Sequence, residues 1–271
     1  MEELLRRLGG ELDLEGMLIV GALVAARVAP LTVFAPWLTL RKTPGMIRGS
    51  LILALTVALA PLALEAADAE AIAQAGPATF GAWALREAML GTLFALATAL
   101  PFFALDWSGR LVDTWRGASL SEVIAPPTGD RTSPLGDLQL MMGVVLFLGL
   151  GGHRVAFRAF AEGLTIAPVG ATDLSGGIEE VAFGAAQLTG SALAFAMSIA
   201  APAAVAIVVV EIGLGLIARS APQVPVFFAG MPLRAATGIA AMLLATSVII
   251  AQLPETFRAA IEIATRWLAS F

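Results

Sequence analysis

Six apolar stretches, separated by charged or Pro/Gly-rich pieces, constrain the fold of this chain more than any other feature. A helix needs about 20 apolar residues to cross the hydrocarbon core of a bilayer, and the third, fifth and sixth stretches approach or exceed that length. The second and fourth are shorter, which is typical of helices that are tilted or packed inside an assembly. The six stretches cover residues 17–40, 49–64, 88–105, 138–152, 181–210 and 235–254.

Lipid cannot satisfy free backbone groups, so segments of this kind are expected to be helical. The predicted fold class is therefore all-α, with polytopic membrane-type helical hairpins and broken helices. Only 14% of the 271 residues are charged, against about 25% in a soluble domain. The chain is thus expected to be a membrane protein or a subunit that partners bury on most sides.

The distribution of charges indicates neither an orientation in a membrane nor binding to nucleic acid. Loops on alternate sides of the six stretches hold seven and eight basic residues, and the positive-inside rule needs a clear excess. The net charge is -5 and there is no basic stripe, so nucleic-acid binding is not expected. The first 16 residues mix Arg6 and Arg7 with five acidic residues, so they do not resemble a cleaved signal peptide.

The sequence contains none of the catalytic or metal-binding motifs H-E-x-x-H, G-x-S-x-G or a Walker-type phosphate loop. There is no cysteine and only one histidine, His153, and carboxylates alone are poor ligands for zinc or copper. We interpret His153 as a residue at a helix end that donates to backbone. Asp130 and Asp137 lie in one loop, so they cannot face each other as aspartic-protease carboxylates do; Ser133 before Pro134 instead predicts a helix start there. We expect no enzyme activity, no metal and no cofactor.

The segment from Glu211 to Arg234 combines charges and prolines between the two most apolar stretches of the chain. Glu211 and Arg219 would lie about 12 Å apart along a helix, which is too far for direct pairing, so each needs another partner or water. Two interpretations remain open: the charges mark the membrane interface at a helix end, or they pair with another subunit. The prolines predict a broken helix, a feature that also occurs at transport sites.

The central segment, residues 106–136, keeps large apolar side chains such as Trp107, Trp115 and Leu120 among its charges. Long loops inside compact proteins are often functional, and a solvated linker would seldom retain so many apolar residues. We expect a folded loop that packs into another part of the molecule or of an assembly.

Three runs of residues resemble the export-apparatus T subunit of type III secretion systems and its flagellar counterpart FliR. The runs are DTWRGASLSEVIAPPTGDRTSPLG (113–136), LFLGLGGHRVAFRAFAEGLTIAPVG (146–170) and LGLIARSAPQVPVFFAGMPLRAATGI (214–239). The Arg-Gly-Ala-Ser and Ser-Pro-Leu-Gly motifs of the first run favour the injectisome over the flagellar system. The residues that carry this likeness, expected at signature turns or subunit contacts, are Arg27, Pro30, Ser133, Pro134, Gly136, Gly152, His153, Glu211, Arg219, Pro222, Gly230 and Pro232.

The resemblance implies a single T-subunit domain over residues 1–271 that joins the R and S subunits (flagellar FliP and FliQ) in a pore for protein export. It further implies a plug-type loop at about 106–137, the U subunit (flagellar FlhB) as a neighbour, and unfolded proteins as exported substrates. The complex would belong to the bacterial inner membrane, within the basal body and raised toward the periplasm. Expected plug or gate residues are Arg110, Trp115, Arg116, Gly117, Ser119 and Leu120.

Two alternatives remain at this point. The chain could be the flagellar protein itself, in the equivalent flagellar export gate. It could also be a self-sufficient secondary transporter with its site at the broken helices, which should transport a solute without partner subunits.

Overall fold

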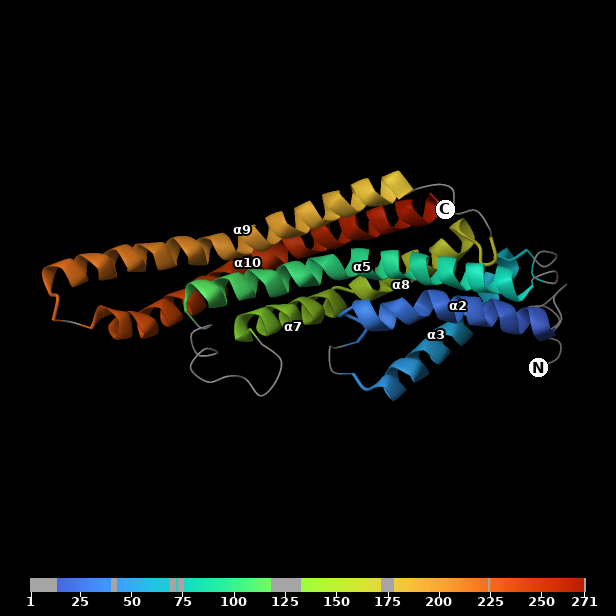
Figure 1. Cartoon of the computed structure of the whole chain (residues 1–271), viewed down its shortest axis with the longest axis horizontal. Coiled ribbons are helices and arrows are strands. Elements are labelled where there is room, and N and C mark those ends of the chain that lie inside the picture. The colour runs from blue at the N-terminus through green and yellow to red at the C-terminus, as the bar shows by residue number, and fades with distance from the viewer. Residues whose placement is uncertain are drawn as a thin grey trace. The chain divides into compact units, whose positions relative to one another are not determined.

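The computed structural model of the chain describes residues 14–39, 43–68, 72, 76–117, 133–171, 178–223 and 225–270. Within these ranges the protein consists of helices and short connections, without strands (Figure 1), as the all-α prediction requires. Seven helices are present there: α2 (Leu14–Phe34), α3 (Gly45–Ala66), α5 (Pro77–Trp115), α7 (Pro134–Gly149), α8 (Gly152–Ile166), α9 (Ile178–Ser220) and α10 (Val226–Ala269).

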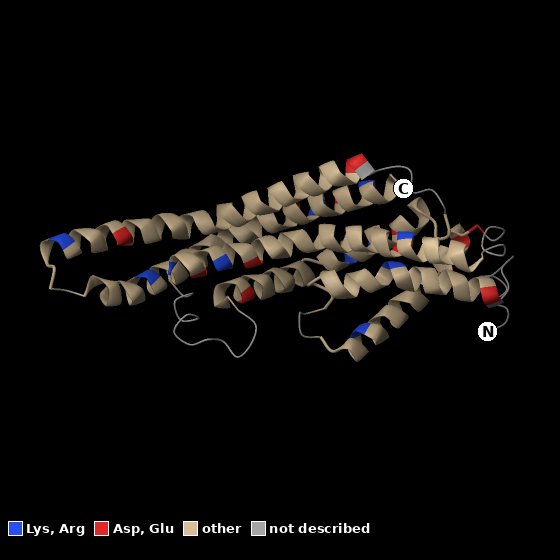
Figure 2. Ribbon diagram, viewed as in Figure 1, with Lys and Arg blue, Asp and Glu red and all other residues tan. Residues whose placement is uncertain are grey.

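Five of the described helices are long and apolar enough to cross a membrane: α2, α3, α5, α9 and α10. The fourth apolar stretch lies in a broken pair, because α7 and α8 are bent by 75° relative to one another. Gly151 lies between them with φ of +77°, a backbone conformation that glycine adopts without strain. Charged residues are sparse along α9 and α10 (Figure 2). The chain therefore has the helices of an integral membrane protein.

The three longest helices extend well beyond the apolar stretches that predicted them. α5, α9 and α10 contain 39, 43 and 44 residues. Pro232 was expected to mark a helix break and Pro30 a signature turn or subunit contact, but they lie inside α10 and α2. Neighbouring helices and local backbone adjustment allow proline inside apolar helices of this kind.

The central loop is shorter than the sequence predicted. Asp106 to Trp115 form the last turns of α5, and Pro134 to Asp137 form the first turn of α7. The polar residues in this part of α5 are spaced at i,i+3 and i,i+4, a spacing that stabilises helices. The loop is therefore confined to the residues between Trp115 and Pro134, of which 118–132 lie outside the described part of the chain.

The chain folds into two compact units. Unit 1 comprises residues 1–100, 150–188 and 257–271, and unit 2 comprises residues 101–149 and 189–256. In unit 1, α2 and α5 approach closely at Gly91, where an added Cβ would lie 2.0 Å from the carbonyl oxygen of Arg27. In unit 2, Phe102 of α5 packs edge-to-face on Phe147 of α7, with ring centroids 5.4 Å apart.

Candidate functional site

Unit 2 contains the α5–α7 junction, where the two ends of the predicted plug segment are joined. The Asp113 carboxylate of α5 accepts hydrogen bonds from the Ser133 hydroxyl and, at 3.1 Å, from the Leu135 backbone N–H of α7. Ser133 also accepts from the Gly136 N–H at 3.0 Å, the bond of a helix N-cap. The predicted helix start at Ser133-Pro134 is thus confirmed, and its cap is bonded to the end of α5.

Two glycines bring α5 and α7 together at this junction. A Cβ on Gly109 would lie 2.4 Å from the Gly136 backbone nitrogen, and one on Gly136 would lie 2.8 Å from the Asp106 carboxylate. One turn further, the buried Ser108 hydroxyl hydrogen-bonds the side-chain oxygen of Gln139. Sliding one helix along the other would break these contacts, so they hold together the base of the predicted loop.

Four of the predicted plug or gate residues lie at the end of α5 or directly after it. Arg110 pairs with Asp106 at 2.9 Å, and Arg116 pairs with Asp113 at 2.6 Å. Trp115 is the last residue of the helix and is half-buried. Gly117 ends the helix with φ of +80°, which favours glycine at this position. Ser119 and Leu120 lie outside the described residues.

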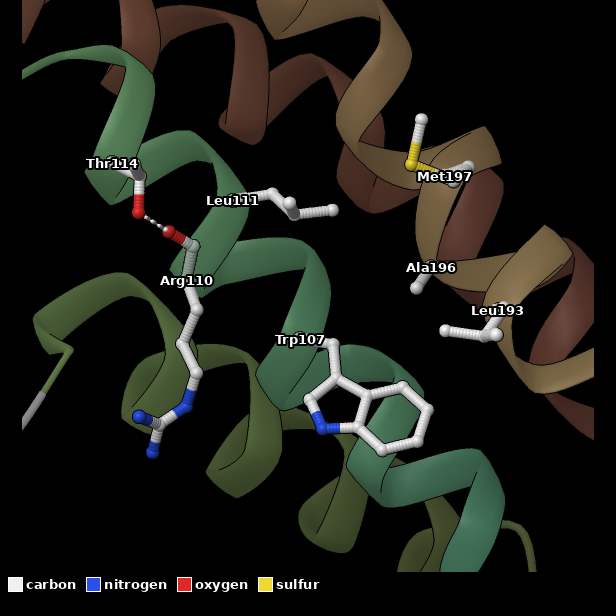
Figure 3. Close-up of a pocket in the computed structure, with 7 residues that line it drawn as sticks. All are labelled: Trp107, Arg110, Leu111, Thr114, Leu193, Ala196 and Met197. Carbon is white, nitrogen blue, oxygen red and sulfur yellow. Dashed lines mark hydrogen bonds between the residues drawn. The ribbon is translucent and has the colours of Figure 1, made fainter. Parts of the chain in front are cut away.

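A pocket of about 310 Å³ opens beside Arg110, between α5 and α9 of unit 2. Trp107 and Leu111 point from α5 toward Leu193, Ala196 and Met197 of α9 (Figure 3). The Arg110 guanidinium points away from this gap, and the Thr114 hydroxyl donates to the Arg110 carbonyl. The pocket therefore has apolar walls and offers no charged group to a ligand.

In unit 1, the signature residue Arg27 belongs to a buried charge cluster that sequence reasoning missed. Arg27 pairs with Glu87, which also pairs with Arg86 at 3.0 Å. Arg27 further donates to the backbone carbonyls of Gly163 at 3.1 Å and Ala167 at 2.8 Å, at the end of α8. All three charged side chains are at most 2% exposed. The cluster therefore ties α2 and α5 to the end of the broken α7–α8 pair.

The Gly-His signature lies at the beginning of α8. Gly152 is its first residue, and His153 is half-buried in its first turn. The predicted hydrogen bond from His153 to backbone is absent among the described residues, where its buried Nδ1 has no partner. No group of three or more His, Cys, Asp or Glu side chains in the described part of the chain could hold a metal ion.

The segment 211–234 is the end of a helical hairpin in unit 2. α9 continues to Ser220 and α10 begins at Val226, with the exposed Pro222 in the turn between them. Glu211 pairs with Arg234 across the hairpin at 2.8 Å, so its partner lies in this chain. Arg219 is exposed and has no ion pair among the described residues.

The same hairpin is closely packed at one signature glycine. An added Cβ on Gly230 of α10 would lie 2.7 Å from the side chain of Leu214 in α9. Larger residues would force the helices apart at this position. Gly230 is therefore a packing residue of the hairpin.

Comparison with known proteins identifies the family. Residues 18–260 match the family described as "Bacterial export proteins, family 1". The flagellar biosynthetic protein FliR of Bacillus subtilis is 26% identical over 69% of this chain and 72% of its own length. The Yop proteins translocation protein T of Yersinia pestis is 31% identical over 59% of this chain and 60% of its own length.

A third relative is aligned over most of both proteins. The surface presentation of antigens protein SpaR of Salmonella typhimurium is 25% identical over 88% of this chain and 87% of its own length. The family match covers nearly all of the described helices. The chain therefore belongs to family 1 of the bacterial export proteins, whose members include flagellar biosynthetic proteins and secretion-system proteins.

Proposed function

We propose that this protein is a non-enzymatic core subunit of a type III secretion export apparatus. It forms the entry pore for unfolded protein substrates together with the R and S subunits, and the U subunit is its neighbour. The assembly belongs to the inner membrane, within the basal body and raised toward the periplasm. Family membership and the long apolar helices support this proposal.

In this proposal the segment between α5 and α7 is the plug that closes the resting pore. The observation that carries the role is the anchored base of the segment, where Asp113 bonds Ser133 and Leu135. A plug that substrate displaces needs ends that stay in place while its middle moves. Arg110, Trp115, Arg116 and Gly117 would belong to that base, and Ser119 and Leu120 to the displaced part.

The injectisome is favoured over the flagellum by the secretion-system relatives. The Yersinia pestis protein T and the Salmonella typhimurium protein SsaT are each 31% identical to this chain, over 59% and 55% of its length. The FliR proteins of Bacillus subtilis and Escherichia coli are each 26% identical, over 69% and 80%. Protein T and SsaT are thus the more similar over shorter parts of the chain, while SpaR, at 25% identity, is about as similar as the FliR proteins.

The hairpin geometry weakens the alternative of a self-sufficient transporter. That alternative placed a substrate site at a helix break within residues 211–234. α9 and α10 instead continue into a short turn, and Glu211 and Arg234 pair with each other. Neither of these two charges is then free to bind a substrate.

Purification of the tagged chain from native membranes distinguishes a subunit from a transporter. We expect a particle much larger than the 27.9 kDa chain, in which mass spectrometry identifies the R and S subunits. Solute transport by the purified chain alone in liposomes, with no partners in the particle, would contradict the proposal.

A further inference from the structure

Helix α3 is the least covered of the apolar helices in unit 1. Only 11% of its most apolar window is buried within the chain, against 44% for α2 and 61% for α5. Its large apolar side chains point outward: Met46 is 88% exposed, Leu53 66% and Val57 67%. A helix that is apolar all round needs apolar surroundings on every side, so something outside the described chain must cover α3.

The length of α3 fits a lipid bilayer. Its 22 residues correspond to about 33 Å of helix, against about 30 Å for the hydrocarbon core. Its only charged residues are Arg48 in the first turn and Glu65 in the last, which lie about 26 Å apart along the axis. The uncharged part of the helix thus has the thickness of a hydrocarbon core.

The charges at the two ends of α3 have opposite sign. Arg48 has no ion pair among the described residues, and by sequence it follows Arg41 and Lys42. The other end is acidic, because Glu65 is followed by Asp68 and Glu70. Basic residues next to an apolar helix complement anionic phospholipid headgroups and are enriched on the cytoplasmic side.

We propose that the exposed face of α3 lies against phospholipid acyl chains, with its Arg48 end at the anionic headgroups of the cytoplasmic surface. The balanced count of basic residues over the whole chain does not conflict with this arrangement, because that count also included arginines such as Arg86 that are buried in the protein. The proposal goes beyond the export role, and it does not depend on the plug.

The absence of native cysteines allows a direct test of the lipid contact. Nitroxide labels at Leu53→Cys and Val57→Cys are compared with one at Ala63→Cys, a buried position on the same helix. The complete export complex is reconstituted in vesicles of phosphatidylethanolamine and phosphatidylglycerol. We expect oxygen to relax the Leu53 and Val57 labels several-fold more than the Ala63 label, and a water-soluble nickel chelate to reach none of them.

Two results would overturn the lipid contact. Low accessibility to both oxygen and nickel at Leu53 and Val57 would show that another protein covers this face. High accessibility to nickel would show that the face lies in water.

Labelling with a membrane-impermeant maleimide tests the orientation in native membranes. We expect Met46→Cys, next to Arg48, to react in inverted vesicles and to be protected in spheroplasts. Asp68→Cys, beyond the other end of α3, should show the opposite pattern. Reaction of Met46→Cys in spheroplasts and protection in inverted vesicles would refute the assigned orientation.

Discussion

Replacing Glu87 with glutamine should open unit 1 at the contact between α2 and α5. Glu87 is fully buried and is the common carboxylate of Arg27 and Arg86. Glutamine keeps the shape of the side chain but removes its negative charge. Two buried guanidinium groups would then lose the carboxylate that they share.

The cost follows from the contacts that remain. Breaking a buried ion pair by removing one partner costs about 3–5 kcal/mol. Arg27 would retain the carbonyls of Gly163 and Ala167 as acceptors, so we expect the lower end of this range. A loss of about 3 kcal/mol corresponds to a roughly 100-fold larger population of the locally open state, at about 1.4 kcal/mol for each factor of ten.

Hydrogen exchange followed by mass spectrometry measures this opening in the purified complex. We expect the slow amides of α2 around Arg27 to exchange roughly 100-fold faster in Glu87→Gln than in the wild type. The matched control is Glu162→Gln, which removes a carboxylate that is 54% exposed and paired with Arg158. An exposed i,i+4 pair contributes about 0.3–0.5 kcal/mol, so the control should exchange nearly as the wild type does.

A second variant guards against a general failure of folding. Adding Arg86→Met to Glu87→Gln removes one of the two buried cations that had shared the carboxylate, and it should restore part of the protection. If Glu87→Gln exchanges within about twofold of the Glu162→Gln control, the buried cluster does not stabilise unit 1 and the reasoning is refuted.

Two further predictions concern helix contacts. Gly91→Ala should prevent assembly of the complex or lower its yield severely, because the new Cβ would lie 2.0 Å from the Arg27 carbonyl oxygen. The control Gly21→Ala, whose Cβ would have nothing within 4 Å, should assemble normally. Equal yields of the two variants would contradict the close approach of α2 and α5. Glu211→Arg and Arg234→Glu should each lower the melting temperature of the complex, because each places two like charges at the site of one ion pair. The double variant exchanges the two charges and should restore the melting temperature. A double variant that melts no higher than either single variant would exclude direct pairing.

The helical fold class and six of the seven described helices could be predicted from the length of the apolar stretches alone, but α8 lies outside those stretches. The helix ends could not, because polar residues near the end of α5 look like a loop. Asp106 with Arg110, and Asp113 with Arg116, pair along the helix, and their spacing was an available signal for a longer α5. Proline was also a poor indicator, since Pro232 lies inside α10.

The charge pairs could be predicted only in part. The separation of Glu211 and Arg219 along a helix correctly indicated that Glu211 needs a partner other than Arg219. Identifying Arg234 as that partner requires the position of the turn between α9 and α10. Arg86 and Glu87 precede an apolar stretch and read as loop charges. Their burial depends on Arg27, 60 residues from Glu87 in the sequence, and no local pattern reports such a contact.

Ion conductance of a plug-deleted complex tests the central proposal most directly. Removing residues 119–124 retains Asp113 and Ser133, which hydrogen-bond at the α5–α7 junction, so the complex should still assemble at full size. The account predicts that membranes containing this complex conduct ions in the absence of substrate, while the wild type does not. Conductance at the wild-type background, in a complex shown to be fully assembled, would contradict it.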